Sequence, residues 1–581
     1  MNPDYKSKTV SEWLKDMFDG TIALTDFQRS HVWKPGRTAT FLKAVLLNQP
    51  TGTVLLVQTG SGFGGRQILD NDAEISHVQS LILDGQQRLT SLWQGLMGRS
   101  DTLYYISVRS LVGLDFKIDD VKYRPKARGY KSYREEFEEN LIPVRVLYDP
   151  PDHDSSNPTR LEEWCEGVIP GDSQRSSQLR RSIEQRFKGP LERYQLWHAR
   201  FEQIGVDEAI TIFIETNRSS VRVTPFDLAV AKVVQIDPAL KLRERIQRLY
   251  SAHDRIQYYF SEDDQRWISE IGEYLLKIGC LKSGSRGTPP KHSNYDDAVE
   301  YLFCNGTKVA DRVEHDLVST LQFLEENGVP NADVLPRVPP VYVIAALQEE
   351  LRGVRQGYKA KAIRLVTEYL WRSFLSDRYE MQANDRLYAD YKCLLDDIQR
   401  VRDGSDPKRD APVFGSNHEV SEDSLRGATK SRSPMGNSLI ALSLKNDGAL
   451  DWVTGERMTP ERIRNLERDG KIDRHHVFTK RSLVRGGLSK DDERINQPFN
   501  IVLIQKLSNI ALGSKEPFEY LEKLRQLDSR LTMRELRSRV ESHLLSYDEI
   551  TRKRGPIEAR YDQYLHSRAK LLWEETQRLI R

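Results

Sequence analysis

The hydrophobic pattern of the N-terminal part of the chain predicts alternating helices and strands. Residues 38–47 form an amphipathic segment of helical period, and the apolar run 54–57 after a Pro- and Gly-containing turn is typical of a strand. The short apolar run 81–83 predicts another strand, and apolar residues recur at helical spacing from 92 to 96. This part of the chain is therefore expected to be α/β.

The remainder is expected to be mostly helical. Apolar residues are spaced by three and four through 268–281, 344–351 and 363–375. Near the C-terminus the apolar run 499–504 predicts a buried strand, and residues 505–512 predict one or two turns of helix. Residues 402–434 are rich in Asp, Gly, Ser, Lys and Arg, which indicates a linker.

Composition favours a soluble multidomain protein. A length of 581 residues corresponds to about three or four domains, and the net charge of +2 argues against coating of nucleic acid by bulk electrostatics. The N-terminus lacks a signal-peptide pattern and no stretch approaches the roughly 18 apolar residues of a membrane span, so we expect a cytoplasmic protein. The four cysteines lie far apart, which predicts reduced, mostly buried thiols.

The C-terminal chemistry centres on the segment Asp473-Arg-His-His-Val-Phe. His475 and His476 are the only adjacent histidines, and they follow a polar turn where a short strand could end. Such a pair can hold a divalent metal with one imidazole and take a proton from water with the other. Asn500 and Asn509 follow, on the predicted strand and helix. The order is that of a one-metal nuclease.

These residues resemble the HNH nuclease family in its ββα-metal form, from about Asp473 to Tyr520. The resemblance implies that His475 is a metal ligand, His476 the general base, Asn500 the residue that orients this base, and Asn509 the second ligand. Asp473 is implied as a further ligand or as a group that supports the ligands. Thr479 stands where the family usually has Pro, which predicts a looser loop.

A second interpretation of the same histidines stays open, because adjacent strand residues face opposite ways and a core histidine is commoner than a ligand. Basic side chains near them are expected either to contact DNA phosphates or to form a solvated face; they are Lys480, Arg481 and Arg485. A basic group interleaved with tyrosines predicts a DNA-contact surface in the N-terminal domain; it comprises Tyr123, Arg124, Lys126, Arg128, Tyr130, Lys131, Tyr133 and Arg134.

The N-terminal motif joins the strand predicted at 81–83 to the next helix through Asp84-Gly-Gln-Gln-Arg-Leu-Thr. A Gly-containing junction of this kind points backbone N–H groups at an anion, and Arg88 could clamp a phosphate. No Gly-x-x-x-x-Gly-Lys-Ser/Thr motif occurs in the chain. An alternative interpretation of Asp84 is an Asx turn or helix N-cap that satisfies backbone donors.

This motif, together with Phe27-Gln-Arg near Trp33 and with Pro50-x-Gly, resembles the N-terminal domain of GmrSD-type proteins over roughly residues 8–240. The resemblance implies a ParB/sulfiredoxin-like nucleotide-binding fold that hydrolyses a nucleoside triphosphate. Asp84 would partner Mg²⁺ or water, and Arg29 and Arg88 would hold phosphate. The implied nucleotide-binding residues are Gln28, Arg29, Asp84, Gly85, Gln86, Gln87, Arg88 and Asn217.

The expected fold class is a multidomain α+β protein. It has an α/β N-terminal domain for nucleotide binding and DNA sensing (1–240), a helical coupling region (241–400), a linker (401–434), an HNH nuclease domain of ββα-metal type (435–530) and C-terminal helices (531–581).

The function predicted from these parts is an NTP-regulated DNA endonuclease of the modification-dependent, type IV restriction class, acting in antiphage defence. Its cofactors would be Mg²⁺ or Mn²⁺ and a nucleoside triphosphate, and its partner double-stranded DNA, either modified phage DNA or phosphorothioated DNA. One site cuts one strand, so a double-strand break needs two nicks or a homodimer. Two alternatives stay open: a phosphorothioate-sensing nickase with NTPase activity, and a nucleotide-dependent DNA-binding module whose HNH-like fold is not catalytic.

Overall fold

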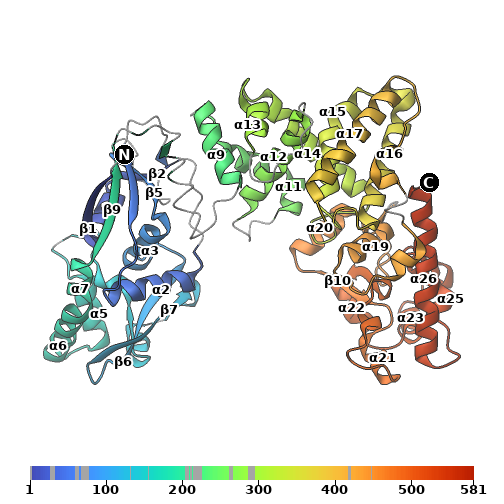
Figure 1. Cartoon of the computed structure of the whole chain (residues 1–581). Helices are drawn as coiled ribbons and strands as arrows, with labels where there is room; N and C mark the ends of the chain where they lie inside the picture. The colour runs from blue at the N-terminus through green and yellow to red at the C-terminus, as the bar shows by residue number, and fades with distance from the viewer. Residues whose placement is uncertain are drawn as a thin grey trace. The chain divides into compact units, whose positions relative to one another are not determined.

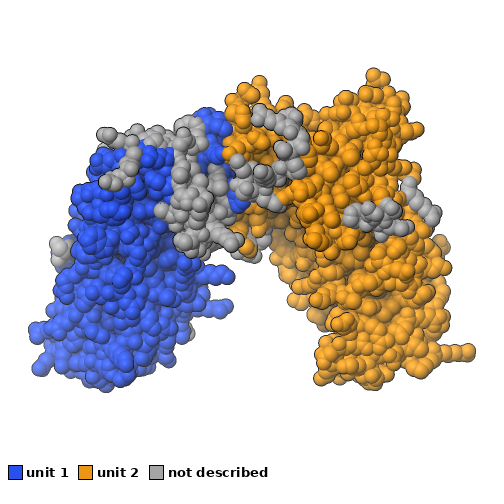
Figure 2. Space-filling view, in the orientation of Figure 1, with its two compact units in different colours: residues 1–242 blue, residues 243–581 orange. Residues whose placement is uncertain are grey.

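The computed structural model of the 581-residue chain divides into two compact units, residues 1–242 and 243–581 (Figure 2). The residues that it describes are 3–25, 33–58, 65–66, 78–130, 132–154, 156–202, 204, 208–209, 212, 225–237, 239–260, 266–284, 295–415, 420–445 and 448–580. Three predicted nucleotide-binding residues, Gln28, Arg29 and Asn217, lie outside these ranges.

Unit 1 (residues 1–242) contains two sheets. Its strands are β1 (Asp4–Thr9), β2 (Ile22–Thr25), β3 (Val54–Gln58), β4 (Gly65–Arg66), β5 (Ser80–Asp84), β6 (Thr102–Ser110), β7 (Asp115–Pro125), β8 (Leu141–Pro143) and β9 (Gln195–Phe201). Among the described residues, six strands form a mixed sheet in the order β1-β9-β3-β5-β2-β4, and three form an antiparallel sheet in the order β7-β6-β8. The strands predicted at 54–57 and 81–83 are confirmed as β3 and β5.

The helices of unit 1, except the last one, pack around one continuous core. They are α1 (Val10–Phe18), α2 (Pro35–Leu46), α3 (Gln86–Met97), α4 (Tyr133–Glu138), α5 (Arg160–Val168), α6 (Ser173–Ile183), α7 (Gly189–Arg193) and α9 (Pro225–Ile236). The core includes three buried tryptophans, Trp13, Trp93 and Trp164. The amphipathic segment predicted at 38–47 is confirmed as α2, which Pro35 begins because its ring presets a helical φ.

The first part of unit 2 (residues 243–581) is helical, as the apolar spacing predicts. Its helices are α10 (Leu242–Ala252), α11 (Asp254–Tyr259), α12 (Trp267–Ser283), α13 (Asp296–Phe303), α14 (Lys308–Glu326), α15 (Pro339–Gly353), α16 (Gln356–Leu375) and α17 (Ala383–Arg402). Tyr369 and Trp371 on α16 are fully buried.

The C-terminal part of unit 2 surrounds one small hairpin with helices (Figure 1). The strands are β10 (Ile472–His476) and β11 (Ile501–Gln505). The helices are α18 (Glu422–Arg426), α19 (Pro434–Leu444), α20 (Pro460–Arg468), α21 (Lys480–Arg485), α22 (Lys506–Leu512), α23 (Pro517–Leu527), α24 (Met533–Glu541), α25 (Tyr547–Ile550) and α26 (Ile557–Ile580). Their core contains Trp452, Phe478, Tyr520, Tyr561 and Tyr564.

The segment 401–434, predicted as a linker from its composition, is held against the helices before it. The Asp397 carboxylate on α17 accepts hydrogen bonds from the backbone N–H groups of Lys408 and Arg409, and Arg409 forms an ion pair with Glu368 on α16. Polar composition alone does not reveal such anchoring, because these contacts use two buried carboxylates of the preceding helices, Asp397 and Glu368.

Two further predictions concern the cysteines and membrane-spanning segments. The four cysteines carry free thiols; Cys165 and Cys280 are buried and Cys393 is half-buried, but Cys304 is exposed. Within the described ranges, no helix combines the length and apolar character needed to cross a membrane. The fold is mixed α/β with small sheets and a mostly helical C-terminal region.

Candidate active site

The hairpin of β10 and β11 and the helix that follows it carry the C-terminal motif. β10 pairs antiparallel with β11, with His475 opposite Val502 and His476 opposite Ile501. α22 begins directly after β11, which gives the strand, strand and helix elements that the sequence predicts. Because side chains alternate along a strand, Asp473 and His475 share one face of β10, whereas His476 lies on the other.

On the first face, His475, Asn509 and Asp473 form a chain of hydrogen bonds. Nδ1 of His475 lies 2.7 Å from Oδ1 of Asn509, and Nδ2 of Asn509 donates to Oδ2 of Asp473 at 2.9 Å. Asp473 therefore turns the Asn509 amide so that its oxygen faces His475. Among the described hydrogen bonds, Asp473 reaches His475 through this amide, so of its two predicted roles the supporting one is the role that we carry forward as a prediction.

His475 is almost completely buried between two aromatic rings. Trp452 and Tyr520 contact its ring edge-on, with centroids 5.5 Å and 5.7 Å away. Burial lowers the pKa of His475 to about 4, so the imidazole is neutral near pH 7. Its Nε2 is buried and has no hydrogen-bond partner in the described part of the chain, so Nδ1 carries the proton that is shared with Asn509.

The pair of His475 and Asn509 fits a divalent metal. If the imidazole proton moves from Nδ1 to Nε2, the neutral ring can give its Nδ1 lone pair to an ion, and an amide oxygen is a ligand that Mg²⁺ and Mn²⁺ accept. The 2.7 Å between Nδ1 and Oδ1 is close to the separation of about 3 Å between neighbouring ligands with bonds of about 2.1 Å. Among the described residues no three His, Cys, Asp or Glu side chains gather as a metal site, so phosphate and water oxygens would supply the other ligands.

On the opposite face, His476 is half-buried and reaches the surface. Its Nε2 lies 3.1 Å from Oδ1 of Asn496, an exposed residue at the end of a 3-10 turn (Glu493–Asn496). With this amide oxygen as acceptor, Nε2 carries the proton and Nδ1 is left with a lone pair. Burial lowers the pKa of His476, and nearby Lys480 lowers it further, although the contact with Asn496 opposes them. The neutral form of His476 can therefore accept a proton near pH 7.

Asn500 shapes the backbone after His476 instead of touching its ring. The fully buried amide accepts from the N–H of Phe478 at 2.8 Å and donates to the carbonyl oxygens of Phe478 and Ile495. The Asn500 carbonyl accepts from the N–H of Val477. No described hydrogen bond joins Asn500 to His476, so Asn500 can orient the base only indirectly, through the backbone that follows it. The side chain that hydrogen-bonds to the His476 imidazole is Asn496.

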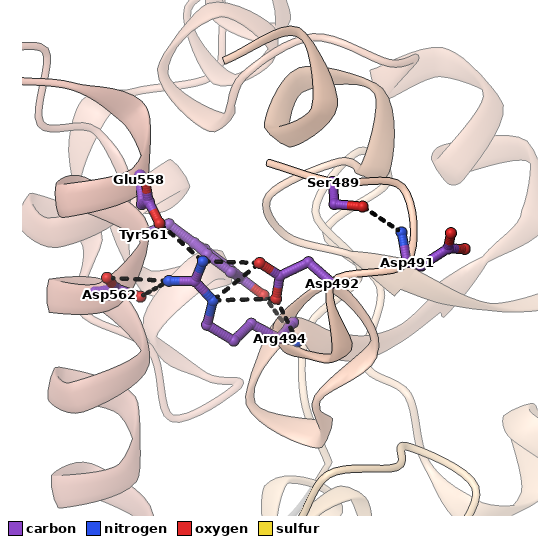
Figure 3. Close-up of polar contacts among 7 residues, drawn as sticks. All are labelled: Ser489, Asp491, Asp492, Arg494, Glu558, Tyr561 and Asp562. Carbon is purple, nitrogen blue, oxygen red and sulfur yellow. Dashed lines mark hydrogen bonds and ion pairs between the residues drawn. The ribbon is translucent and has the colours of Figure 1, made fainter. Parts of the chain in front are cut away.

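The segment that presents Asn496 is fixed by Arg494 (Figure 3). The Arg494 guanidinium donates to Asp492 at 2.7 Å, to Glu558 at 2.8 Å and to Asp562 at 3.0 Å. The hydroxyl of Tyr561 donates to the Arg494 carbonyl at 2.6 Å. Since three of these four partners lie on α26, Arg494 ties the segment beside His476 to the long C-terminal helix.

Replacing Arg494 by alanine is expected to lower the single-turnover rate of DNA cleavage by roughly 10- to 100-fold, because Asn496 loses its fixed position. The dissociation constant for DNA should change little. Arg537→Ala is the matched control, since Arg537 also pairs with two carboxylates, Glu541 and Asp548, but lies on α24. Equal rate losses in both variants would contradict a positioning role for Arg494.

The three predicted DNA-binding cations lie together on the short helix after the hairpin strand. Lys480, Arg481 and Arg485 on α21 are exposed, and none forms an ion pair among the described residues. The loop before α21 is not loosened by Thr479, contrary to our expectation. Thr479 Oγ1 accepts from the N–H of Ser482 and donates to the carbonyl of Ser514, so it caps the helix and anchors the turn.

Asn496, Asp451 and Trp452 belong to the site but carry no recognisable sequence signal. Asp451 is fully buried and accepts from the N–H of Gln505 at 2.9 Å and the hydroxyl of Ser508 at 2.6 Å, which fixes the start of α22. Trp452 packs against His475. Asp451 and Trp452 precede the motif by about twenty residues, and only the fold brings them to it.

The N-terminal motif forms the junction between β5 and α3. Gly85 has φ +101°, and a Cβ there would lie 2.9 Å from a methyl carbon of Val54, so the tight turn requires glycine. Arg88 donates to Oδ2 of Asp84 at 3.0 Å and to the carbonyl of Thr51 at 3.2 Å. Gly52 has φ +91° and lets the guanidinium pass close over its Cα, which explains the Pro-x-Gly element.

Several polar groups lie at this junction, at the C-terminal end of the inner strand β5. Gln87 Oε1 accepts from the backbone N–H of Trp33 at 3.1 Å, whereas Gln86 is buried. The N-cap residue of α3 is Gly85, which has no side chain to cap the helix, so the helix begins at the end of β5 with its positive dipole end. Asp84 uses Oδ2 for Arg88, and Oδ1 forms no hydrogen bond among the described residues. Asp84 is thus an ion-pair partner of Arg88 and not a side-chain cap.

Comparison with known proteins supports the family resemblance of the N-terminal region. The family described as GmrSD restriction endonuclease, N-terminal domain, matches residues 10–234. An uncharacterized protein of Methanocaldococcus jannaschii is 21% identical over 623 aligned positions, which cover the full length of both chains. Residues 10–234 are thus similar to the N-terminal domain of GmrSD restriction endonucleases, which indicates a restriction-type nuclease with DNA as its substrate.

Proposed function

We propose that the chain is an NTP-regulated DNA endonuclease of the modification-dependent restriction class that acts in antiphage defence, with an HNH-type hydrolytic centre in unit 2. The observation that carries the proposal is the pairing of His475 Nδ1 with Asn509 Oδ1 on one face of β10, beside His476 on the other. The similarity of residues 10–234 to a restriction endonuclease domain supplies the substrate class.

His475 and Asn509 would hold Mg²⁺ or Mn²⁺, which when bound stabilises charge on a phosphate oxygen and on the leaving 3′ oxygen. Nδ1 of His476 removes a proton from the attacking water. Asn496 accepts from the opposite nitrogen and so keeps the ring in the tautomer that this step requires. Lys480, Arg481 and Arg485 bind the phosphates beside the scissile bond.

The N-terminal junction would bind the nucleoside triphosphate. The positive dipole end of α3 and the Arg88 guanidinium would attract its phosphates, and Asp84 can turn its second oxygen to a cation. Hydrolysis in unit 1 would license cleavage in unit 2. Residues Gln28, Arg29 and Asn217 remain proposed contributors to this site.

The proposed function is tested with a panel of DNA substrates. Unmodified plasmid, phage DNA with modified bases and phosphorothioated DNA are each incubated with Mg²⁺ or Mn²⁺, with and without each NTP. We expect nicking or cutting that requires a divalent metal, is greatest on one modified substrate and responds to one NTP. Metal-dependent cleavage of every substrate at one rate would contradict modification dependence, and an absence of cleavage throughout would contradict the nuclease.

The cleavage rate is expected to depend on pH through His476. Because burial lowers the pKa of His476 below its usual 6.5, the base is neutral at pH 7 and the rate should fall only as pH drops through that lowered pKa. Asn496→Asp places a carboxylate on Nε2 and stabilises the imidazolium, so the acid limb should move up by about 1 pH unit or more. Asn496→Ala removes a contact that raises the pKa and should not move it upward. An unmoved limb in Asn496→Asp would contradict His476 as the base.

A further inference from the structure

The three-stranded sheet of unit 1 carries an exposed row of positive charge along the last four residues of β7, after its aspartates, and along the 3-10 turn that follows (Lys126–Arg128). Every residue from 122 to 128 is exposed, and this stretch holds four cations and no carboxylate; the cations are Lys122, Arg124, Lys126 and Arg128. None of the four forms an ion pair within the described part of the chain. Asp120 lowers the net charge near Lys122 without an ion-pair contact, so the row stays positive through separate cations that are not held in salt bridges.

The backbone gives this row a fixed, extended shape. β7 pairs only with β6 among the described strands, so it is an edge of the sheet. Lys122 and Arg124 project from the face opposite to the buried Val121, because strand side chains alternate. On the Val121 side, the Tyr123 ring lies against Gly36 at the start of α2 and braces the strand.

Positive side chains on an edge strand also protect against pairing with another sheet. That role requires a charge facing the open edge, but it does not require four cations without a single carboxylate. It also leaves unexplained why the row continues past the end of β7 through Lys126 and Arg128 in the following turn. A linear array of unpaired cations complements a linear polyanion.

The aromatic rings of this surface indicate which polyanion it fits. The Arg124 guanidinium covers the Tyr130 ring at 4.2 Å, and Tyr105 contacts that ring edge-on at 5.3 Å. The Tyr130 ring is therefore not open for stacking on an unpaired base, as binding of single strands would require. Contacts from flexible cations to phosphates suit a duplex backbone.

We infer that Lys122, Arg124, Lys126 and Arg128 form a binding surface for the phosphate backbone of double-stranded DNA, separate from the proposed nuclease centre. The inference rests on the proposed function for its choice of DNA. Such a surface lets unit 1 bind DNA independently of its sequence, so the DNA stays bound whatever modification it carries.

The test compares two triple variants in full-length protein that carries His476→Ala, so that DNA is bound but not cut. Lys122→Gln/Arg124→Gln/Arg128→Gln removes three charges from the surface. The control Arg175→Gln/Arg181→Gln/Arg186→Gln removes three exposed charges on and after α6. Binding of a fluorescent 30-base-pair duplex, a length of about three helical turns, is measured by anisotropy across about 50 to 200 mM salt.

For the surface variant, the slope of log K against log salt should become shallower by about 2.7, or 0.9 for each lost phosphate contact. The control slope should stay near that of the parent. If the triple variant folds poorly, Lys126→Gln alone should make the slope shallower by about 0.9. Equal changes in both triple variants, or no change in either, would overturn the inference, as would a larger loss for single-stranded than for duplex DNA.

Failure of this inference is distinguishable from failure of the proposed function. A shallower slope in the surface variant, together with no DNA cleavage by the parent without His476→Ala, would support the DNA-binding surface and contradict the nuclease. Metal-dependent cleavage by the parent without His476→Ala, combined with an unchanged slope in the surface variant, would do the reverse.

Discussion

Replacing His476 by alanine is expected to lower the single-turnover rate of DNA cleavage by roughly 10²- to 10⁴-fold, the usual contribution of a positioned general base. The reason is local: His476 is the half-buried imidazole of the hairpin, and its pKa is lowered by burial, so a neutral nitrogen is available at pH 7. Quenched time courses on supercoiled plasmid, with enzyme in excess, measure this rate.

The same variant should keep its fold, its affinity for DNA and its NTP hydrolysis. Within the described part of the chain, the His476 side chain makes one hydrogen bond, to the exposed Asn496, so its replacement removes a single polar contact. Circular dichroism and anisotropy provide these controls. A rate within a fewfold of wild type in a folded His476→Ala protein would show that another group activates the water.

Replacing Arg88 by alanine is expected to lower NTP hydrolysis by roughly 10²- to 10³-fold, comparable with the loss of one donor to a developing charge. Asp84→Ala should act in the same direction, because Asp84 holds the guanidinium and offers a carboxylate oxygen to a cation. Both variants should then alter how cleavage responds to NTP, while metal-dependent nicking without nucleotide remains. Phosphate release measures the first effect and plasmid nicking the second.

Arg99→Ala is the matched control for Arg88. Arg99 also belongs to unit 1 and pairs with an aspartate, Asp152, at 3.2 Å, but both side chains are about half exposed and lie beyond the end of α3. Its loss should leave hydrolysis unchanged. If Arg88→Ala hydrolyses NTP like wild type, the nucleotide site lies elsewhere.

The sequence predicted the local elements of the hairpin well because their signals are local. An apolar run marks β11, and the residues after it form α22 within a residue of the predicted bounds. The strand-to-helix junction at Gly85 was predictable for the same reason, since a glycine between an apolar run and a helical period marks such a turn.

The residues that complete the candidate site could not be predicted, because they arrive through tertiary structure. Asn496 lies in a polar stretch with no motif, and its contact with His476 depends on Arg494 and α26, more than sixty residues further along the chain. For Asn500 the difficulty is the opposite one. Its place in the motif was clear from the sequence, but its side-chain amide hydrogen-bonds to the backbone of Phe478 and Ile495 and not to His476. Sequence spacing cannot distinguish a side chain that faces a ring from one that fixes the strand beneath it.

The central claim, a one-metal hydrolytic centre on this hairpin, is tested most directly by titrating Mn²⁺ into cleavage reactions of wild type, His475→Ala and Asn509→Ala. We expect no cleavage in chelator, a single-site saturation curve for Mn²⁺ in wild type, and a requirement for at least 10-fold more Mn²⁺ in both variants. Cleavage that persists in chelator, or variants that saturate at the wild-type concentration, would contradict it.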